Sequence, residues 1–506
     1  MRKINELKAG SILSYVNLFI SCIIPMLYTP VMLDLLGQSE YGLYSLSNSV
    51  VGYLGLLNFG MGSAVIRYAV KFRAQGSAVD VRRVIGLFTM IYAGLALLVC
   101  VGGAVLTAVV GSIFGKGLTV DEIARMKVLL VIMTVSTAIS FPLSVFSAII
   151  GVYERYVFQK LVCVGETIMA PVMNLVVLYA AGGSVGLAVV GLVFQVVNGL
   201  IFGAYCVKKL KIYPVFKNMP VEILREVAVF CAFVFLASIV DMLYWATDKV
   251  LIGAAIGSVA VAIYNVGGTF TAMLQNMAHA ISNVFGPRVN MMVAKHDEPG
   301  KISELLIRVG RLQYLVISLL LSGYIVFGSP FVVLWAGAEY QQAYYVALLT
   351  MVPLTVPLIQ NIAFTTIMAQ NKHRFRSVVY AVIAVVNVIS TWLVLPYYGI
   401  IGAAACTAVS FILGQGIIMN LYYYRVTGLD IPAFWRNILR MSLVPGGMIA
   451  AGLALVEWVI PMTSMWMLLL CAVVYAVIFA VLSWLVSMNS YEKKLFGGML
   501  KWIMPK

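Results

Sequence analysis

The chain has 506 residues, of which 62% are hydrophobic and 10% are charged, and its formal net charge is +15 at pH 7. This composition leaves no room for a second, soluble domain of ordinary size, so the whole chain is predicted to be one membrane unit. The positive charge is spread over short segments beside apolar stretches, where insertion topology and anionic headgroups account for it, which argues against nucleic acid as a partner.

Fourteen apolar stretches follow one another along the sequence. Most reach the roughly 20 residues that an α-helix needs to cross a hydrocarbon core about 30 Å thick. We therefore predict an all-α polytopic membrane protein with about 14 transmembrane helices. The predicted spans are 11–36, 41–65, 84–114, 128–150, 161–181, 185–207, 227–246, 259–287, 305–335, 345–369, 378–395, 400–423, 441–459 and 467–486.

The basic residues predict the orientation of these helices. All but four of the 34 Lys and Arg residues fall in alternate gaps between the apolar stretches. Because cytoplasmic loops retain Lys and Arg, those gaps are predicted to be inside and both termini cytoplasmic. The four exceptions are Lys116, Arg125, Lys127 and Lys249.

Enzyme and metal signatures are weak throughout. The seven cysteines lie inside apolar stretches without metal-ligand or disulfide spacing, and of the histidines only His279 is placed to face an interior. The segment GSIFGKG at 111–117 lacks the glycine spacing and the Ser/Thr of a phosphate-binding loop. The longest external gap, 115–127, is too short for an extracytoplasmic catalytic domain. We predict a protein that is not an enzyme and holds no metal or cofactor.

Weak internal similarity predicts a repeat. A gap-free shift that lays Gly37 on Gly257 also lays Tyr44 on Tyr264, and a similar shift lays GGSVGLA at 182–188 near YGIIGAA at 398–404. Six helices separate the copies, so both have the same orientation and are related by an axis along the membrane normal. The predicted domains are an N-terminal lobe at 1–226, a C-terminal lobe at 227–428, and an interfacial segment, helix pair and amphipathic cytoplasmic tail at 429–506.

Acidic residues inside apolar stretches are the first candidates for a site, because charge at bilayer depth is expensive and usually functional. Asp241, Tyr244, Trp245 and Asp248 follow i, i+3, i+4, i+7 spacing, which would place two carboxylates and two rings on one helix face, suited to a sugar or a cation. In the alternative, Asp248 pairs with the adjacent Lys249 and Asp241 bonds to a neighbouring helix. Glu166 in the fifth helix is a further candidate.

The eighth helix has a face of small and polar residues at alternating spacings of three and four. Such a face indicates either a lumen or a seam where helices pack closely. On the first interpretation, Gln275 and His279 bind substrate or ion. The face comprises Tyr264, Gly268, Thr271, Gln275, His279, Ser282 and Gly286.

Several arginines begin or end helices on the predicted cytoplasmic side. Arg67, Arg288, Arg308 and Arg311 could each bind a phosphate through charge-assisted bidentate hydrogen bonds. The alternative is that they only anchor the helices by the positive-inside rule. Arg67, Arg288 and Arg311 are retained as candidates for diphosphate binding.

Five segments of the sequence are distinctive: LYTPVMLDLLGQSEYGLYSL at 27–46, LLNFGMGSAVIRYAVKFRAQG at 56–76, DKVLIG at 248–253, AIYN at 262–265, and GIIGAA. They resemble segments of the bacterial polysaccharide flippases of the multidrug/oligosaccharidyl-lipid/polysaccharide superfamily. The resemblance covers nearly the full length. Asn58 departs from it, since relatives often carry Asp there, which puts a coupling role of this position in doubt.

The resemblance implies two lobes around a central cavity in the bacterial cytoplasmic (inner) membrane. It also implies flipping of undecaprenyl-diphosphate-linked oligosaccharide for O-antigen or capsule by alternating access, driven by a gradient of H+ or Na+. Glycosyltransferases and a polysaccharide polymerase would act before and after it. Two other functions stay open: a cation-coupled exporter of drugs or metabolites with the same fold, and a membrane-bound transferase or polymerase.

Overall fold

The computed structural model describes residues 2–295, 298–372, 374–458 and 462–503, and within these ranges the regular elements are all helical. The predicted end of the thirteenth span at Val459 and the last residues of the predicted tail lie outside the described residues. The chain divides into two compact units, Met1–Asn265 and Val266–Lys506, and the division falls inside helix α9 (Ser258–Ser282). The predicted domain boundaries at 226 and 428 stay a prediction.

Eleven helical segments in the described part of the chain are long and apolar enough to cross a membrane. Two of them, Val16–Ala74 and Arg374–Thr427, have 59 and 54 residues and each has room for two crossings. Helix α9 falls outside this set because of its polar face, although its 25 residues suffice for a crossing. The chain is therefore a multi-pass, all-α membrane protein, as predicted.

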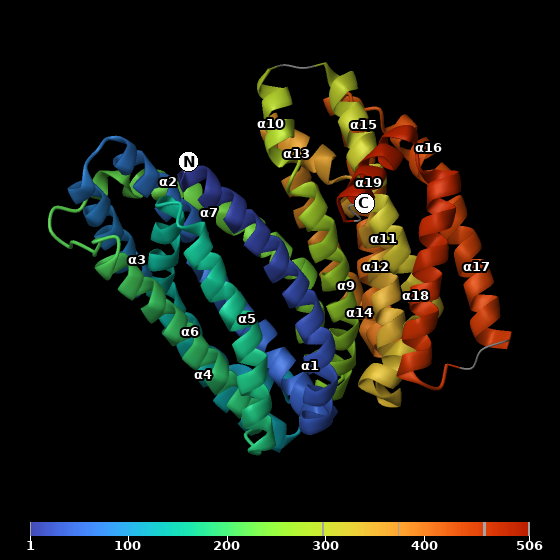
Figure 1. Cartoon of the computed structure of the whole chain (residues 1–506). Coiled ribbons are helices and arrows are strands. Elements are labelled where there is room, and N and C mark those ends of the chain that lie inside the picture. Colours follow the sequence, from blue (N-terminus) through green and yellow to red (C-terminus); the bar gives the residue numbers. More distant parts are fainter. Residues whose placement is uncertain (1, 296–297, 373, 459–461, 504–506) are drawn as a thin grey trace. The chain divides into compact units, whose positions relative to one another are not determined.

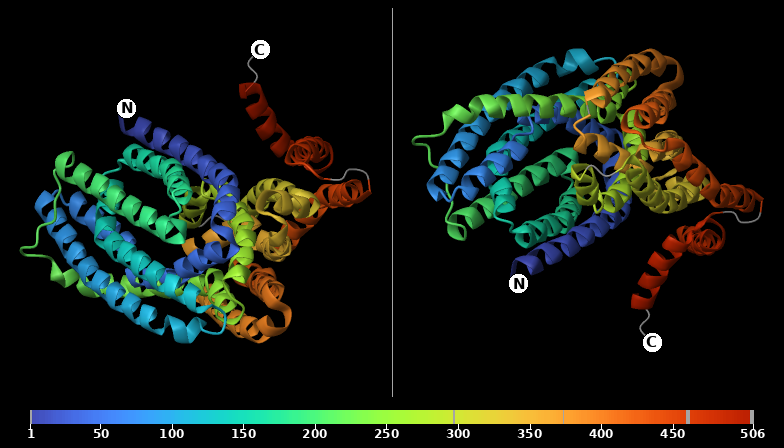
Figure 2. Two further views of the ribbon diagram at one scale, coloured as in Figure 1. Left: turned by 90° about the horizontal axis from the view of Figure 1, so that it is seen from below. Right: turned by 90° about the horizontal axis from the view of Figure 1, so that it is seen from above.

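The N-terminal unit is built around α4. This helix packs against α3 and α6, while α1 runs beside α5 (Figure 1, Figure 2). The elements are α1 (Arg2–Gly55), η1 (Leu56–Asn58), α2 (Met61–Ala74), α3 (Ala78–Phe114), α4 (Val120–Val152), α5 (Tyr156–Tyr179), α6 (Gly183–Lys208), η2 (Val221–Ile223), α7 (Leu224–Trp245) and α8 (Thr247–Ala255).

The C-terminal unit is built around α11, which contacts α12, α16, α17 and α18. Its elements are α10 (Gly286–Ala294), α11 (Pro299–Ala336), η3 (Ala338–Tyr340), α12 (Gln342–Ile359), α13 (Asn361–Ala369), α14 (Arg374–Phe411), the π-helix η4 (Ile412–Ile418), α15 (Met419–Thr427), α16 (Ile431–Met441), α17 (Leu443–Trp458), α18 (Met465–Leu482), the π-helix η5 (Ser483–Ser487) and α19 (Ser490–Ile503).

Glycines break the two longest helices where the sequence predicts a boundary between spans. Gly37 in α1 has φ 73° and ψ 167°, and Gly399 in α14 has φ 57° and ψ −148°. Their predicted repeat partners, Gly257 and Gly183, also have positive φ, at 127° and 56°. At Gly37 and Gly399 this backbone conformation is close to glycine-only, so these two breaks require glycine, and the positive φ of Gly257 and Gly183 also favours it.

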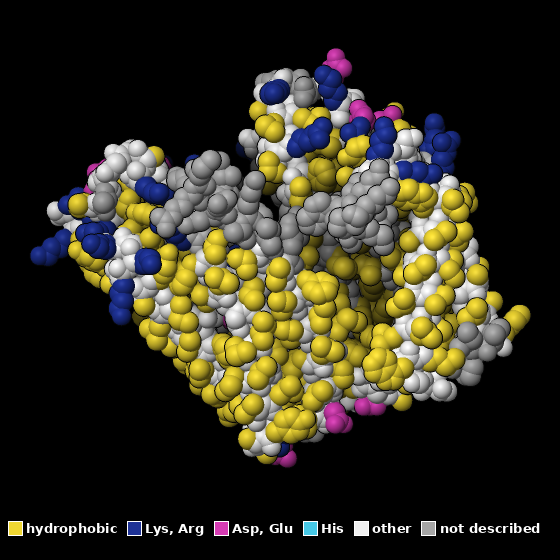
Figure 3. Space-filling view, in the orientation of Figure 1, with side chains coloured by type: hydrophobic (Ala, Val, Ile, Leu, Met, Phe, Trp, Pro, Cys, Tyr) yellow, Lys and Arg dark blue, Asp and Glu magenta, His cyan; other side chains and the backbone are white. Residues whose placement is uncertain are grey.

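Side chains on the surface of each unit separate by chemistry. Hydrophobic side chains cover the flanks of the helices, whereas most visible Lys and Arg gather at one end of each unit (Figure 3). In the N-terminal unit the opposite end carries an acidic network in which Glu40 pairs with Arg125, and Glu122 accepts hydrogen bonds from Ser39 and Ser258. An apolar belt between polar ends is what a bilayer requires.

Candidate functional site

The predicted stripe on the seventh helix does not form one face. The helix ends at Trp245, and Ala246, with φ −114° and ψ −27°, separates α7 from α8. Tyr244 and Asp248 are buried, at 6% and 2% exposure, whereas Trp245 is 40% exposed and Asp241 is also exposed. The prediction of a shared face is wrong, because i to i+7 spacing aligns residues only along an unbroken helix.

Asp248 lies in the first turn of α8 and is held by α9. Its Oδ2 accepts a hydrogen bond of 2.6 Å from the hydroxyl of Tyr264, and both residues are buried. The start of α8 is also fixed by Thr247, whose hydroxyl lies 2.6 Å from that of Tyr53 in α1. The carboxylate therefore has a defined partner on another helix, in addition to its neighbour Lys249 in the chain.

Lys249 is part of a hydrogen-bonded chain that joins three helices. Its Nζ donates to Oδ1 of Asn265 at 2.5 Å, and Nδ2 of Asn265 donates to the hydroxyl of Tyr41 at 2.6 Å. Lys249 comes from α8, Asn265 from α9 and Tyr41 from α1. A half-buried ammonium in an apolar membrane unit requires such partners, because an unpaired charge there is costly.

The hydrogen-bonded residues Lys249, Asn265 and Tyr41 border a cavity of ≈ 240 Å³ within the N-terminal unit. Oδ1 of Asn174 is buried on its wall with no hydrogen-bond partner among the described residues, the hydroxyl of Tyr28 lies beside the Asn174 side chain, and Asn48 is exposed. Buried polar atoms without partners are rare and mark places where a ligand or water completes the bonding. The lining residues are Tyr28, Met32, Tyr41, Tyr44, Ser45, Asn48, Asn174, Leu187, Lys249 and Asn265.

The remaining acidic candidate, Glu166, lies away from this lining. It is half-buried in α5 and hydrogen bonds with Asn198 of α6. This contact stabilises the packing of α5 on α6, and nothing in the described residues brings Glu166 into the cavity.

The polar face of α9 divides between the two units. Tyr264 belongs to the N-terminal unit, where it binds Asp248. In the C-terminal unit His279 is exposed, and its Nδ1 lies 3.3 Å from Nδ2 of Asn361, which also donates to Ser282 at 3.0 Å. Gln275 is half-buried. Asn361 thus joins α13 to the polar face of α9, and a binding role for Gln275 and His279 stays a prediction.

Arg67 and Arg288 are exposed on two short helices. The guanidinium carbon of Arg67, in α2, lies 5.3 Å from the ring centre of Phe230 in α7. Arg288 lies in the first turn of α10. Since a ring face uses none of the guanidinium donors, Arg67 still has donors for an anion.

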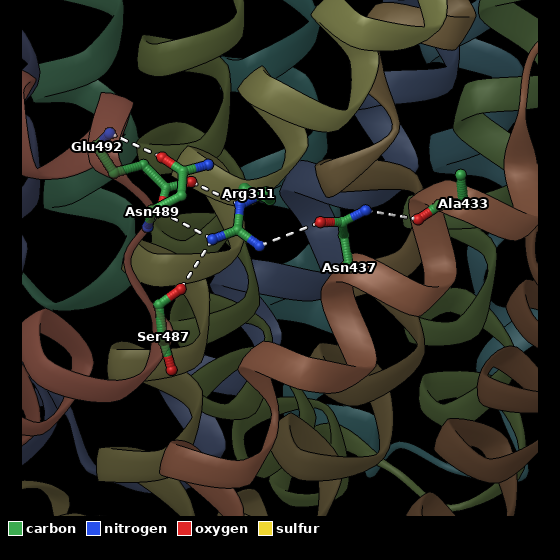
Figure 4. Close-up of polar contacts among 6 residues, drawn as sticks. All are labelled: Arg311, Ala433, Asn437, Ser487, Asn489 and Glu492. Carbon is green, nitrogen blue, oxygen red and sulfur yellow. Dashed lines mark hydrogen bonds and ion pairs between the residues drawn. The ribbon is translucent and has the colours of Figure 1, made fainter.

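Arg311 is bound to other parts of the protein. Its side chain is 8% exposed and donates to both oxygens of Glu492, to the carbonyl of Ser487 and to Oδ1 of Asn437 (Figure 4). A diphosphate would have to displace these partners, so we do not retain Arg311 for the proposed substrate site. Arg308, one turn earlier, pairs with Glu304 and lies 4.5 Å from the ring centre of Tyr491.

Among the residues that the structure describes, no group of three His, Cys, Asp or Glu side chains is arranged to hold a metal ion. The polar features that remain are hydrogen-bonding groups, a few charges and aromatic rings. They suit binding and conformational change more than covalent chemistry.

Comparison with known proteins places the chain in a family. A model of the polysaccharide biosynthesis protein family matches residues 7–293, more than half of the chain. The chain belongs to that family. The matched region includes the whole N-terminal unit apart from its first residues, and hence the complete cavity around Lys249.

One protein is similar to this family member in sequence, and two solved structures are similar to it in fold. A protein of Shigella flexneri named "Putative O-antigen transporter" is 22% identical over 400 residues, which cover 76% of this chain and 90% of that protein. The structure of the lipid II flippase MurJ in an inward closed conformation matches 94% of this chain and 99% of its own, with a TM-score of 0.74 and 15% identity.

An inward-facing multidrug resistance MATE family transporter of the MOP superfamily matches 83% of this chain and 99% of its own, with a TM-score of 0.60 and 14% identity. At these identities the two structures show that the fold is shared. The predicted all-α polytopic fold is thereby confirmed, and the family match confirms the resemblance to proteins of polysaccharide biosynthesis.

Sequence reasoning about this family member missed the residues that form the cavity. Lys249 was expected only as a partner of Asp248, and Tyr28, Tyr41 and Asn174 were not singled out. One signal was present, because Lys249 is one of the four basic residues outside the basic gaps. A lysine that breaks the charge rule in a gap between two predicted spans is a candidate that the sequence alone can single out.

Proposed function

We propose that this protein flips undecaprenyl-diphosphate-linked oligosaccharide units across the bacterial cytoplasmic membrane for the synthesis of surface polysaccharide. The observation that carries the proposal is the family match over residues 7–293, joined with a fold shared with a lipid II flippase over 94% of the chain. Both termini are cytoplasmic in this proposal, because the basic gaps face inside.

The chemistry of the described residues supports such a substrate. A diphosphate requires cationic donors, which the exposed Arg67 and Arg288 offer. Sugars require hydrogen bonds and ring faces, which the cavity around Lys249 offers. A prenyl tail can remain in lipid, so the protein needs no large apolar cavity of its own for it.

Transport proceeds by alternating access, driven by an H+ or Na+ gradient. The chain consists of two compact helical units, the kind of rigid body that rocks in transporters built from repeats. The charged residues at membrane depth, Asp241, Asp248 and Glu166, are the candidates for ion coupling. The enzymes that assemble the unit act before this step and a polymerase acts after it.

A second candidate is a cation-coupled exporter of drugs or metabolites, favoured by the shared fold with the MATE family transporter. The two functions differ in the deletion strain. Without a flippase, complete lipid-linked units accumulate on the cytoplasmic leaflet and surface polysaccharide is lost, whereas loss of a drug exporter leaves polysaccharide intact and changes toxin sensitivity.

The test isolates the lipid-linked pool from the deletion strain and treats whole cells with an impermeant sugar oxidant. The proposal expects units that are complete and protected from the oxidant, and expects the intact gene to restore surface polysaccharide. Units that the oxidant reaches would indicate a polymerase defect. Unchanged polysaccharide, in a strain with no second flippase, would contradict the proposal.

A further inference from the structure

We infer that the cavity in the N-terminal unit binds one acidic sugar ring, and that Lys249 pairs with its carboxylate. The inference rests on the proposed function in one respect only, which is that the sugar belongs to a lipid-linked unit. The cavity itself is formed by four elements of one compact unit, α1, α5, α6 and the α8–α9 pair.

The charge of the cavity indicates an anionic group. Lys249 is the single charged residue among the described lining residues, which include no Asp or Glu. The Asp248 carboxylate is the adjacent residue in the chain, but its Oδ2 is bound by Tyr264 and it does not line the cavity. An ammonium has three N–H donors, and the hydrogen bond to Asn265 uses one.

The neutral lining indicates a hydroxylated ligand. Besides Lys249 it offers three phenol groups, three amide side chains and one serine. Oδ1 of Asn174 lacks a protein partner and the hydroxyl of Tyr28 lies beside that side chain, so the wall presents a group that only accepts next to a group that can donate. A sugar hydroxyl, which both donates and accepts, can bond to both.

The size of the cavity indicates a single ring. Its volume of ≈ 240 Å³ far exceeds the roughly 10–15 Å³ that one water needs, and it lies just below the roughly 300–1,000 Å³ of drug-sized pockets. Tyr28 and Tyr44 supply aromatic faces against which a ring can pack. The exposed side chain of Asn48 marks the accessible rim.

The test measures binding to the purified full-length chain in detergent by saturation-transfer NMR, with glucuronate and glucose as probes. The charge-assisted hydrogen bond should make glucuronate bind about tenfold more tightly than glucose, which corresponds to about 1.4 kcal/mol. Lys249→Gln should abolish this preference. Lys116→Gln, at an exposed lysine of the same unit, should keep it.

A second variant keeps the test decisive if Lys249→Gln does not fold. Asn174→Asp leaves Lys249 in place but adds a carboxylate to the cavity wall, so it should weaken the binding of glucuronate more than that of glucose and thereby reduce the preference. Equal binding of both probes to the natural chain, or a preference that survives both variants, would overturn the inference. Inorganic phosphate that displaces glucuronate at equal concentration would overturn the sugar part, because phosphate carries charge without a ring.

The two proposals can fail separately. Loss of polysaccharide in the deletion strain, with no preference for glucuronate in the purified chain, would overturn only the ligand of the cavity. A preference that depends on Lys249, with intact polysaccharide in a deletion strain that has no second flippase, would overturn only the proposed function.

Discussion

Arg311 and Glu492 form a buried ion pair, with Nε of the arginine 2.6 Å from Oε1 of the glutamate and side-chain exposures of 8% and 0%. The same carboxylate accepts the backbone N–H of Asn489 at 2.8 Å, and the Asn489 side chain accepts the N–H of Glu492 at 2.9 Å. This reciprocal pair is a capping box at the start of α19. One carboxylate thus both caps the C-terminal helix and anchors it to α11.

The first prediction concerns this anchor. Glu492→Gln should lower the free energy of unfolding by about 3–5 kcal/mol if α19 unfolds together with the C-terminal unit, because it leaves a buried arginine without its counter-charge. The measurement is the thermal unfolding midpoint of the purified chain. Lys494→Gln, at an exposed position of the same helix, should change the free energy by less than about 0.5 kcal/mol.

A double replacement separates charge from packing at the same place. Arg311→Met combined with Glu492→Leu removes both charges and keeps apolar volume, so it should recover most of the stability lost in Glu492→Gln. If Glu492→Gln were as stable as the natural chain, the anchor would contribute nothing.

The second prediction concerns the break at Gly37. A Cβ there would meet no atom within 4 Å, so Gly37→Ala has no steric contact to lose, yet φ 73° with ψ 167° is close to glycine-only backbone. The replacement should therefore destabilise the protein by about 1–3 kcal/mol through backbone strain alone.

The matched control is Gly62→Ala in α2. A Cβ at Gly62 also meets nothing within 4 Å, but its backbone is helical, so alanine should be neutral or stabilise the chain by up to about 1 kcal/mol. Equal effects of the two replacements on the unfolding midpoint would refute the strain argument.

The breaks at Gly37 and Gly399 could be predicted from sequence, because each separates two apolar stretches of membrane-spanning length. The break at Ala246 could not, since no Gly or Pro marks it. It depends on the contacts of α8, where Thr247 meets Tyr53 and Asp248 meets Tyr264. Asp241 lies before the break and Asp248 after it, so the two side chains face different neighbours and do not share one helix face.

The cavity was beyond sequence reasoning for a related reason. Its polar groups come mostly from α1 and one each from α5, α8 and α9, and only the packing of these helices brings Asn174 near Lys249. Periodicity detects a face of one helix, and it carries no information on which faces of distant helices meet. The distribution of Lys and Arg did single out Lys249, but it gave no indication that Asn265 is its hydrogen-bond partner.

The third prediction is the orientation of the chain. Lys116 and Asn218 are both exposed, one between α3 and α4 and the other between α6 and α7. In whole cells Lys116→Cys should react with an impermeant maleimide and Asn218→Cys should not, above the background of the seven native cysteines. Reversed labelling would overturn the cytoplasmic termini.

The fourth prediction compares the two carboxylates of the divided stripe. Since Asp248 is buried and its carboxylate is bound by Tyr264, Asp248→Asn should lower the free energy of unfolding by about 1–3 kcal/mol, and Tyr264→Phe should do the same.

Asp241→Asn should leave the protein level in the membrane normal, because the side chain is exposed, while strongly reducing surface polysaccharide. The checks are membrane abundance by immunoblot and polysaccharide by quantitative sugar analysis. Unchanged polysaccharide in Asp241→Asn would remove Asp241 from ion or sugar binding, and lost expression would assign it a structural role.

The last prediction tests the diphosphate site. Arg67 and Arg288 are exposed and each retains guanidinium donors, whereas Arg311 is engaged by Glu492. Replacing both Arg67 and Arg288 by Gln should weaken binding of the lipid-linked substrate by about 3–6 kcal/mol, if each contributes one charge-assisted contact of about 1.5–3 kcal/mol.

The control for this double replacement is Lys493→Gln combined with Lys494→Gln on α19, which removes the same formal charge. Each pair is measured with labelled lipid-linked substrate and purified protein at two salt concentrations, because general surface attraction is screened by salt. Equal, salt-sensitive losses in both pairs would mean that bulk charge attracts the diphosphate, and that neither Arg67 nor Arg288 makes a specific contact with it.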